Sequence, residues 1–179
     1  GVQTCELPIL CSQSTGLETC QNKTKQKLDE MVSEGKVLKV YEPTDWCSNM
    51  TVVEKVKPNG EIKIRICLDP SQSINKAIIV PKYPIPTILE ILPIFSPKKF
   101  KRFAIMDALD GFTQVTLNEE SSKVTTMQTP WGRYRWLRLP YGISSAPEEF
   151  QKCIHEALDG LPGVISIHRS EERRVGKEC

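Results

Sequence analysis

The sequence lacks long hydrophobic runs, a strong net charge and paired cysteines. Its apolar stretches end after four or five residues, far short of the roughly 20 needed to span a bilayer, so we expect no membrane partner. The formal net charge is only +2, so nucleic-acid binding would depend on local clusters of Lys and Arg. The seven cysteines show no paired spacing, and no signal-peptide pattern precedes them. We therefore expect a reducing, intracellular setting, in the cytoplasm or the nucleus.

What is present is enough for one folded domain of mixed secondary structure. The chain has 179 residues, of which 39% are hydrophobic, so a real core is possible. Amphipathic spacing predicts helices over residues 23–35 and 144–160, whereas the first twenty or so residues show no period and are expected to lack fixed structure. Helical and alternating segments are mixed without strict alternation and without a repeat, which predicts an α+β fold.

Several alternating segments predict strands. Residues 51–68 alternate on both sides of Pro58-Asn59-Gly60, which indicates a β-hairpin. Residues 113–117 and 123–129 alternate around an expected turn, "NEESS", and residues 132–139 form a further alternating run. These patterns predict a sheet with several short strands.

Three shorter signals complete the expected elements. Thr87 precedes Glu90 by three residues, a spacing typical of a capping box that opens a short helix. "RFAIMD", residues 102–107, is nearly continuous in apolar residues, as expected of a strand covered on both faces. "GVISI", residues 163–167, is also strand-like.

Each candidate functional residue has an ordinary structural interpretation beside a functional one. Asp107, at the end of the expected strand, could hold a divalent cation or simply cap a turn. Arg65 and the basic string 97–102 could contact phosphates, although exposed charges are more often only solvated. Trp131, Tyr134 and Trp136 could stack on bases or pack in a core, and the helix entry "LPYGISSAP" could attract an anion or show ordinary capping. Taken singly, none of these signals decides the function.

Taken in order, the motifs resemble the reverse transcriptase domain of gypsy-type long-terminal-repeat retrotransposons. The similarity runs from Lys25 to Ile167, about four-fifths of the chain, as a collinear series. The segments that carry it are "EPTDWCSNMTVVEKVKPNGEIKIRICLDP", "INKAIIVPKYPIPTILEILP", "FAIMDALDGFTQVTLNEESSKVTTMQTPWGRYRWLRLPYGISSAPEEFQK" and "LPGVISI". The resemblance implies an RNA-directed DNA polymerase, a nucleotidyltransferase that joins deoxynucleoside triphosphates to the primer of an RNA or DNA template-primer.

The resemblance also implies roles for residues around the first acidic motif. Two Mg2+ ions would clamp the attacking and leaving oxygens, with the Asp107 carboxylate and the Ala108 carbonyl as ligands. Backbone amides near Asp110 and Gly111 would hold the triphosphate. The ring of Phe112 would lie under the sugar and reject a ribose 2′ hydroxyl, which makes DNA the expected product.

The remaining implied site residues lie in the hairpin and in the "LPYG" motif. Arg65 would grip the incoming triphosphate, with Lys57 assisting. Tyr141 and Gly142 would line the nucleotide pocket and support the template.

The implied fold is a right-hand polymerase fold that contains the fingers and a partial palm, without the thumb. On this interpretation residues 25–85 and 118–145 are fingers, and residues 86–117 and 146–168 are palm. "LDPSQSINK" departs from the family pattern, because it is one residue longer and lacks the expected arginine or aspartate after its proline. That puts the local loop, but not the fold, in question.

The two ends of the chain depart further from the family. In the family a tight turn with two adjacent aspartates follows the "LPGV" strand, but no such pair follows Ile167. Residues 169–179, "RSEERRVGKEC", and the opening "GVQTCELPI" instead resemble translated sequencing adapters. We therefore expect an adapter-derived or unstructured segment at 1–24, a polymerase fragment at 25–168 and an adapter-derived tail at 169–179. The fragment is expected to be inactive; the alternatives are a non-catalytic nucleic-acid-binding remnant or a non-functional relic.

Overall fold

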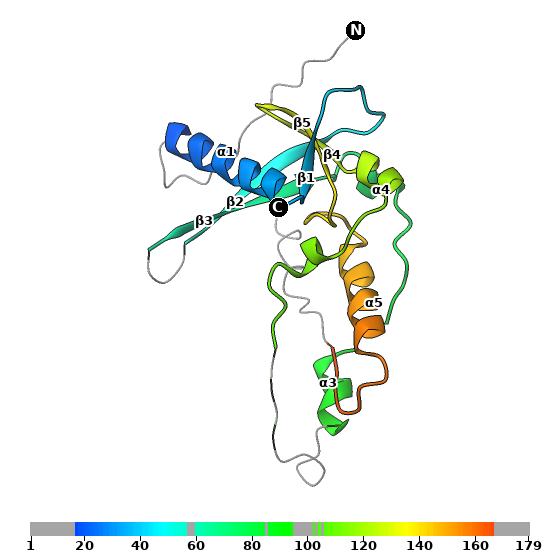
Figure 1. Ribbon diagram of the computed structural model, residues 1–179. Coiled ribbons are helices and arrows are strands. Elements are labelled where there is room, and N and C mark those ends of the chain that lie inside the picture. The colour runs from blue at the N-terminus through cyan, green and yellow to red at the C-terminus, as the bar shows by residue number, and fades with distance from the viewer. Residues whose placement is uncertain are drawn as a thin grey trace.

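A five-stranded sheet with one long helix on its face organises the structure (Figure 1). The computed structural model describes residues 17–56, 60–84, 86–94, 102, 104 and 106–166. The strand order is β1-β5-β4-β2-β3. The elements of this layer are α1 Leu17–Ser33, β1 Val37–Val40, β2 Ser48–Val56, β3 Ile62–Asp69, β4 Thr126–Thr129 and β5 Gly132–Trp136.

The predicted hairpin of residues 51–68 is confirmed. Strands β2 and β3 pair antiparallel over eight residue pairs, from Asn49 opposite Asp69 to Val56 opposite Ile62. Of the expected turn, Pro58 and Asn59 lie outside the described residues. A short parallel contact, in which Ser48 pairs with Met127, joins this hairpin to β4 and β5. The sheet therefore brings residues 126–136 beside residues 48–69.

The core lies between the sheet and α1. Leu28 and Met31 of the helix are 0% and 5% exposed, and Ile64 and Ile66 of β3 are buried beneath it. Because side chains alternate along a strand, Arg65 between those two isoleucines points to the opposite face of the sheet. The inward-facing hydrophobic residues of β3 thus pack in the core, whereas the opposite face of the hairpin carries Arg65 together with its exposed pairing partner Val53.

Helix α1 begins earlier than the sequence indicates. It starts at Leu17, so the expectation that the first twenty or so residues lack structure is wrong for residues 17–20. The side chain of Cys20 is fully buried and disulfide-bonded. None of the other described cysteines, Cys47, Cys67 and Cys153, is disulfide-bonded to it. The expectation of reduced cysteines is not met at this position.

The segment expected to be a turn, "NEESS", is instead the start of helix α4, Glu119–Val124. The side chain of Asn118 accepts a hydrogen bond of 2.8 Å from the amide of Ser121 and caps the helix. The strand expected just before it is reduced to one isolated bridge between Thr116 and Arg138, because Gly111–Gln114 form a 3-10 turn, η2. Local capping here outweighs the alternating pattern.

The long helix predicted over residues 144–160 is confirmed as α5, Ala146–Leu158. Ser145 occupies the N-cap position but makes no side-chain capping bond, and Pro147 lies in the first turn. Phe150 is 8% exposed and packs in the core, as its four-residue spacing with Ile154 predicts. The helix runs away from the sheet toward the end of the molecule that carries the short helix α3, Ile88–Ile91 (Figure 1).

The predicted capping box at Thr87 and Glu90 is confirmed. The amide and hydroxyl of Thr87 donate hydrogen bonds of 2.7 and 2.9 Å to Oε2 of Glu90. These bonds hold the pKa of the Glu90 carboxyl below its usual range. They open the short helix α3, Ile88–Ile91, which continues as a 3-10 turn, η1, Leu92–Ile94.

Two expected strands are not formed where the structure describes them. Arg102, Ala104 and residues 106–108 are irregular and exposed, and Met106 is 86% exposed. Residues 164–166 are also irregular, and the Gln151 amide instead donates to the carbonyl of Ser166 at 3.1 Å. A strand needs a neighbour for its backbone hydrogen bonds, and no strand among the described residues pairs with either segment.

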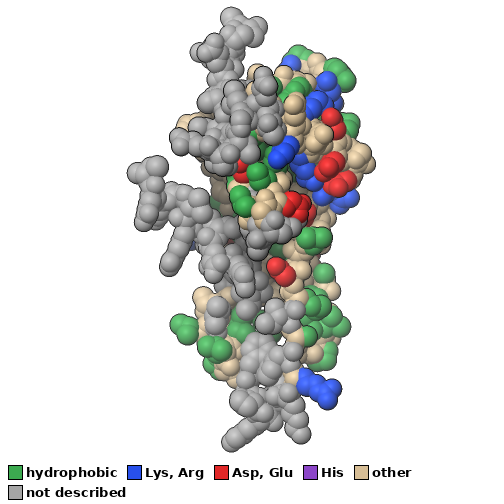
Figure 2. All heavy atoms as spheres, turned by 90° about the vertical axis from the view of Figure 1, so that its left-hand side faces the viewer, with side chains coloured by type: hydrophobic (Ala, Val, Ile, Leu, Met, Phe, Trp, Pro, Cys, Tyr) green, Lys and Arg blue, Asp and Glu red, His purple; other side chains and the backbone are tan. Residues whose placement is uncertain are grey.

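The end of the molecule that carries α3 exposes hydrophobic side chains (Figure 2). They include Leu89, Leu92, Ile94, Leu161 and Val164, each at least 41% exposed. None of the helices in the described ranges is sufficiently long and apolar to cross a membrane.

Candidate nucleotide site

Three of the predicted nucleotide-binding residues lie together although they are far apart in the sequence. The guanidinium carbon of Arg65, on β3, lies 4.8 Å from the centroid of the Tyr141 ring, a cation–π contact. The Tyr141 ring lies 5.1 Å from the ring of Phe112, which is only 6% exposed. Phe150 of α5 completes the group with an edge-to-face contact of 5.4 Å to Phe112. A positive charge is thus held against a buried aromatic cluster.

The loop that carries Tyr141 is bound to the end of β3 through its backbone. The amide of Leu68 donates a 3.0 Å hydrogen bond to the carbonyl of Tyr141. Gly142 has φ +108, and a Cβ at that position would lie 2.0 Å from the carbonyl oxygen of Leu68. Both the backbone conformation and the space therefore require glycine. The predicted site residue Gly142 allows the close approach that places Tyr141.

Asn75, which no sequence motif singles out, also holds this loop. It lies in the short helix α2, Ile74–Ala77, and its side-chain amide bonds to the carbonyl of Gly142 and to the amide of Ser144. Its partners are 67 and 69 residues away in the sequence. No local pattern around Asn75 carries a signal for a contact over that distance.

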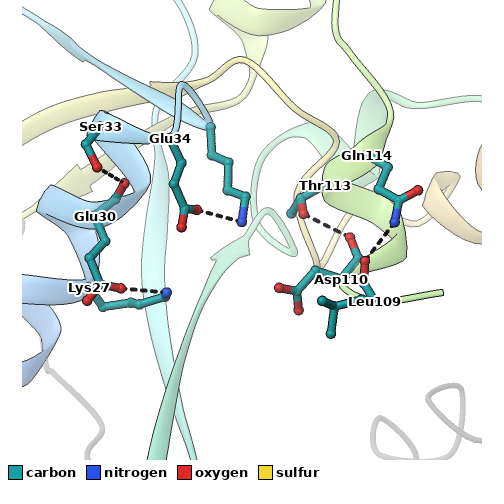
Figure 3. Close-up of polar contacts among 9 residues, drawn as sticks. Lys27, Glu30, Ser33, Glu34, Leu109, Asp110, Thr113 and Gln114 are labelled. Carbon is teal, nitrogen blue, oxygen red and sulfur yellow. Dashed lines mark hydrogen bonds and ion pairs between the residues drawn. The ribbon is translucent and has the colours of Figure 1, made fainter. Parts of the chain in front are cut away.

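The turn that contains Asp110 and Gly111 is held by the side chains that follow it (Figure 3). Asp110 adopts the left-handed conformation, φ 48 and ψ 45. The Thr113 hydroxyl donates to the Asp110 carbonyl at 2.9 Å, and the Gln114 amide donates to the Leu109 carbonyl at 2.8 Å. The Asp110 carboxylate turns away from these two bonds (Figure 3). The backbone of the turn is therefore ordered while its carboxylate stays out of the local hydrogen-bond network.

Gly111 packs directly against the aromatic cluster. A Cβ on Gly111 would lie 2.4 Å from the Phe150 ring, so glycine lets the turn approach α5. This approach places Phe112 between Tyr141 and Phe150. The aromatic contacts and the turn are thus parts of one packed unit.

The predicted metal ligand Asp107 lies just before this turn and is exposed, as is Ala108. No group of three or more His, Cys, Asp or Glu side chains close enough to hold an ion occurs in the part of the chain that the structure describes. Two adjacent divalent cations repel one another, and several carboxylates are needed to offset that repulsion. One carboxylate and one carbonyl do not fit a two-ion site.

The remaining candidate residues are only partly described. Lys57 lies outside the described residues, and of the basic string 97–102 only Arg102 is described; it is exposed. Tyr134 and Trp136 are 3% and 1% exposed and belong to the core. Base stacking on these two aromatics is therefore excluded in this conformation, and the packing interpretation is confirmed.

A cavity of about 600 Å3 lies at the opposite end of α5 and contains none of the predicted site residues. It is lined by α3, by the last turns of α5 and by residues 164–166. His155 at its edge shares a 2.5 Å hydrogen bond between its Nδ1 and the hydroxyl of Tyr83. The nucleotide-site candidates therefore gather near the sheet, away from this cavity.

Comparison with known proteins identifies what this chain is similar to. A family profile described as "Reverse transcriptase (RNA-dependent DNA polymerase)" matches residues 55–170. The Retrovirus-related Pol polyprotein from transposon 297 of Drosophila melanogaster is 30% identical over 154 residues, which cover 86% of this chain and 14% of that protein. The corresponding polyprotein from transposon 412 is 31% identical and covers 84% of this chain and 12% of that protein. The chain therefore spans a small part of the relatives that it matches.

Solved structures show the same fold at lower identity. The foamy viral protease-reverse transcriptase in complex with dsDNA matches 90% of this chain and 32% of its own, with a TM-score of 0.63 and 20% identity. The same protein in complex with an RNA/DNA hybrid gives a TM-score of 0.62, 19% identity and coverages of 88% and 20%. The α+β assignment and the right-hand polymerase fold, in partial form, are thereby confirmed.

The close backbone contact at Gly142 leads to a stability prediction. Replacing Gly142 by Ala adds both backbone strain and an overlap with the Leu68 carbonyl, whereas Gly160→Ala adds strain alone, because at φ +78 its Cβ meets nothing within 4 Å. We expect Gly160→Ala to lower the free energy of unfolding by about 1–2 kcal/mol. Gly142→Ala should lower it by a further ~1–3 kcal/mol because of the overlap. Urea unfolding of the two variants measures the difference, and equal losses would show that the loop can move away from β3.

Proposed function

Because the chain belongs to the reverse transcriptase (RNA-dependent DNA polymerase) family, we propose that it forms the part of such a polymerase that grips the incoming deoxynucleoside triphosphate. The family catalyses RNA-directed DNA synthesis and uses divalent metal ions. The observation that carries the proposal is the packing of Arg65, Tyr141 and Phe112 into one cluster. These three residues were assigned to the nucleotide from motifs 29 to 76 positions apart, and their contact gives those assignments a common location.

Each residue of the cluster has a chemical task in this proposal. Arg65 supplies a permanent positive charge and several N–H donors for the triphosphate, and its stacking on Tyr141 restricts where that charge can lie. The ring of Phe112 is packed between Tyr141 and Phe150 and only 6% exposed; in this proposal its exposed edge lies under the sugar and rejects a ribose 2′ hydroxyl. The ordered amides of the Asp110–Gly111 turn face the phosphates. Lys57 assists from the hairpin.

Magnesium is the ion that we propose for the intact polymerase, with Asp107 and the Ala108 carbonyl as two of its ligands. Carboxylate and carbonyl oxygens suit this hard cation. When bound, the ions would supply charge stabilisation for the attacking and leaving oxygens. The 179 residues contain Asp107 but no adjacent pair of aspartates, so we derive no catalytic step for this chain.

Template-primer is the proposed macromolecular partner. The related foamy viral protein has been solved with dsDNA and with an RNA/DNA hybrid, and the fold that it shares with this chain supports the same class of ligand here. Tyr141 and Gly142 would support the template beside the nucleotide. A second candidate function is non-catalytic binding of nucleic acid by this fragment, favoured by the lack, in the described part of the chain, of a group of three or more potential metal ligands.

We also propose the finer assignments of origin and boundaries. The element is of the gypsy type, residues 25–168 contain the fingers and a partial palm, and residues 1–24 and 169–179 include translated adapter sequence. The collinear motifs support the first assignment, and the two adapter-like segments support the last. Sequencing the genomic locus across Ile167 is expected to reveal a coding sequence that diverges from this chain at Arg169. If genomic DNA encodes residues 169–179 as written, the adapter hypothesis is wrong.

Removing the Arg65 charge should weaken nucleotide binding. On a template-primer with a blocked 3′ end, we expect Arg65→Ala to raise the apparent Kd for the next complementary dNTP about 10- to 100-fold, the effect of losing charge-assisted hydrogen bonds. Mobility-shift titration at fixed ionic strength and fixed Mg2+ measures this change.

Lys27→Ala is the matched control for that experiment. It also removes one positive charge, but from α1 on the far face of the sheet, where Lys27 pairs with Glu30 (Figure 3). We expect its dNTP affinity to equal that of the unchanged chain. Equal losses in both variants would mean that net charge, rather than a site at Arg65, governs binding.

The 179-residue chain itself should not extend a primer. With template-primer, all four dNTPs and Mg2+, we expect extension at background level, because a single carboxylate cannot offset the repulsion between two divalent cations. Asp107→Asn should give the same background. Extension that depends on Asp107 would contradict the proposal that this fragment is catalytically incomplete.

A further inference from the structure

The side chain of Asn75 joins two segments that the nucleotide site needs in register. Its Nδ2 donates a 3.0 Å hydrogen bond to the Gly142 carbonyl. Its Oδ1 accepts a 2.9 Å hydrogen bond from the Ser144 amide. The two partners are two residues apart on the loop that connects β5 to α5, whereas Asn75 lies in α2, directly after β3. The Asn75 side chain thus makes one donor and one acceptor hydrogen bond to the backbone of this loop, as the backbone of a neighbouring strand would.

The two bonds require the chemistry of a primary amide. The Gly142 carbonyl needs a donor and the Ser144 amide needs an acceptor, and an asparagine side chain presents one of each in a single plane. The two partners also fix the orientation of the amide, since the reversed orientation would place donor against donor and acceptor against acceptor. Aspartate keeps the size but offers two acceptors. Alanine offers neither.

The loop that Asn75 binds is the one that carries Tyr141. Among the described residues, Leu68 also anchors this loop: its amide bonds to the Tyr141 carbonyl, and Gly142 fits against its carbonyl. The Asn75 bonds lie immediately after these anchors along the chain. They fix the direction in which the loop leaves β3, and therefore the angle at which the Tyr141 ring meets its neighbours.

Those neighbours are Arg65 and Phe112, at 4.8 and 5.1 Å from the Tyr141 ring. A change in the path of residues 141–144 would move the surface against which the Arg65 guanidinium and the Phe112 ring rest. The contacts therefore connect Asn75 to both the triphosphate-binding charge and the sugar-facing ring. Asn75 itself need not touch the nucleotide.

We propose that Asn75 is a positioning residue that sets the geometry of the nucleotide site through the Tyr141–Ser144 loop, and thereby the selection of deoxyribose over ribose. The inference rests on the proposed nucleotide-binding function. A small displacement of the Phe112 ring would leave its aromatic contacts largely intact. The same displacement would make room for a ribose 2′ hydroxyl, so sugar selection depends on the exact position of the ring. Loss of the Asn75 bonds should therefore weaken selectivity as well as affinity.

The test compares Asn75→Ala and Asn75→Asp in the 179-residue chain on a blocked template-primer. The apparent Kd is measured by mobility shift for the complementary deoxynucleotide and for the matching ribonucleotide, dGTP and GTP. For Asn75→Ala we expect about tenfold weaker dGTP binding, the effect of losing one or two hydrogen bonds, and at least a threefold smaller ratio of the GTP to the dGTP constant. Asn75→Asp should lose as much, because an oxygen would face the Gly142 carbonyl.

Asn118→Ala is the matched control. It also removes a side-chain bond to a backbone amide, that of Ser121, but at the start of α4. Its expected cost in unfolding free energy is comparable, while both nucleotide constants should stay unchanged. Amide hydrogen exchange over residues 141–145 and over β5 adds a second readout: in the Asn75 variants exchange should rise in the loop and not in the strand.

The possible results separate this inference from the function on which it rests. If the unchanged chain forms no nucleotide-dependent complex, both are overturned. Suppose instead that the complex forms and that Arg65→Ala weakens it. If both Asn75 variants then bind dGTP and GTP with the same Kd values as the unchanged chain, only the inference about Asn75 is overturned. Normal selectivity in Asn75→Asp with loss only in Asn75→Ala would show that Asn75 merely fills space. Unfolding of both variants would make Asn75 a residue of the fold and equally overturn the positioning role.

Discussion

The contact on which the candidate site depends is the one between the end of β3 and the loop at Tyr141 and Gly142. It consists of a backbone hydrogen bond from Leu68 and a glycine so close that a Cβ would lie 2.0 Å from the Leu68 carbonyl. Backbone-to-backbone contact of this kind leaves little freedom, because no flexible side chain separates the two segments. Arg65, three residues before Leu68 on the same strand, is thereby brought over the Tyr141 ring. Without this contact the positions of Arg65 and Tyr141 relative to each other would not be fixed.

The contacts within the candidate site are individually weak, but together they hold its side chains in fixed positions. The cation–π contact of the half-buried Arg65 contributes about 0.5–2 kcal/mol, and each of the two aromatic pairs around Phe112 adds about 0.5–1.5 kcal/mol beyond burial. Together these contributions are comparable to a few hydrogen bonds. In the proposed function these contacts would fix a charge and a ring in place before a ligand arrives, which would lower the ordering cost of binding.

The sequence allowed the prediction of elements with local signals and missed those that depend on distant partners. The hairpin at residues 51–68, helix α5 and the capping box at Glu90 each follow from alternation, spacing or capping within a few residues. The strands expected at 102–107 and 163–167 were wrong where they are described, because apolar composition does not supply a pairing strand. Asn118 capping turned an expected turn into α4. Asn75 was missed because its partners lie 67 and 69 positions away.

The residues proposed to bind the nucleotide and the residue proposed to bind metal ions are held in different ways in this chain. The proposed nucleotide-binding residues Arg65, Phe112 and Tyr141 lie on or against the sheet, where strand pairing, glycine contacts and aromatic packing hold them. Asp107 lies in an irregular, exposed segment before the 3-10 turn, and no neighbouring strand fixes its backbone among the residues described. A carboxylate that coordinates an ion must be held in a fixed position and must have other ligands beside it. A ligand that is not already fixed must be ordered when the ion binds, and that ordering reduces the binding free energy. The two proposed sites are therefore held by different means, and the one that packing already organises is the one that contains Arg65, Phe112 and Tyr141.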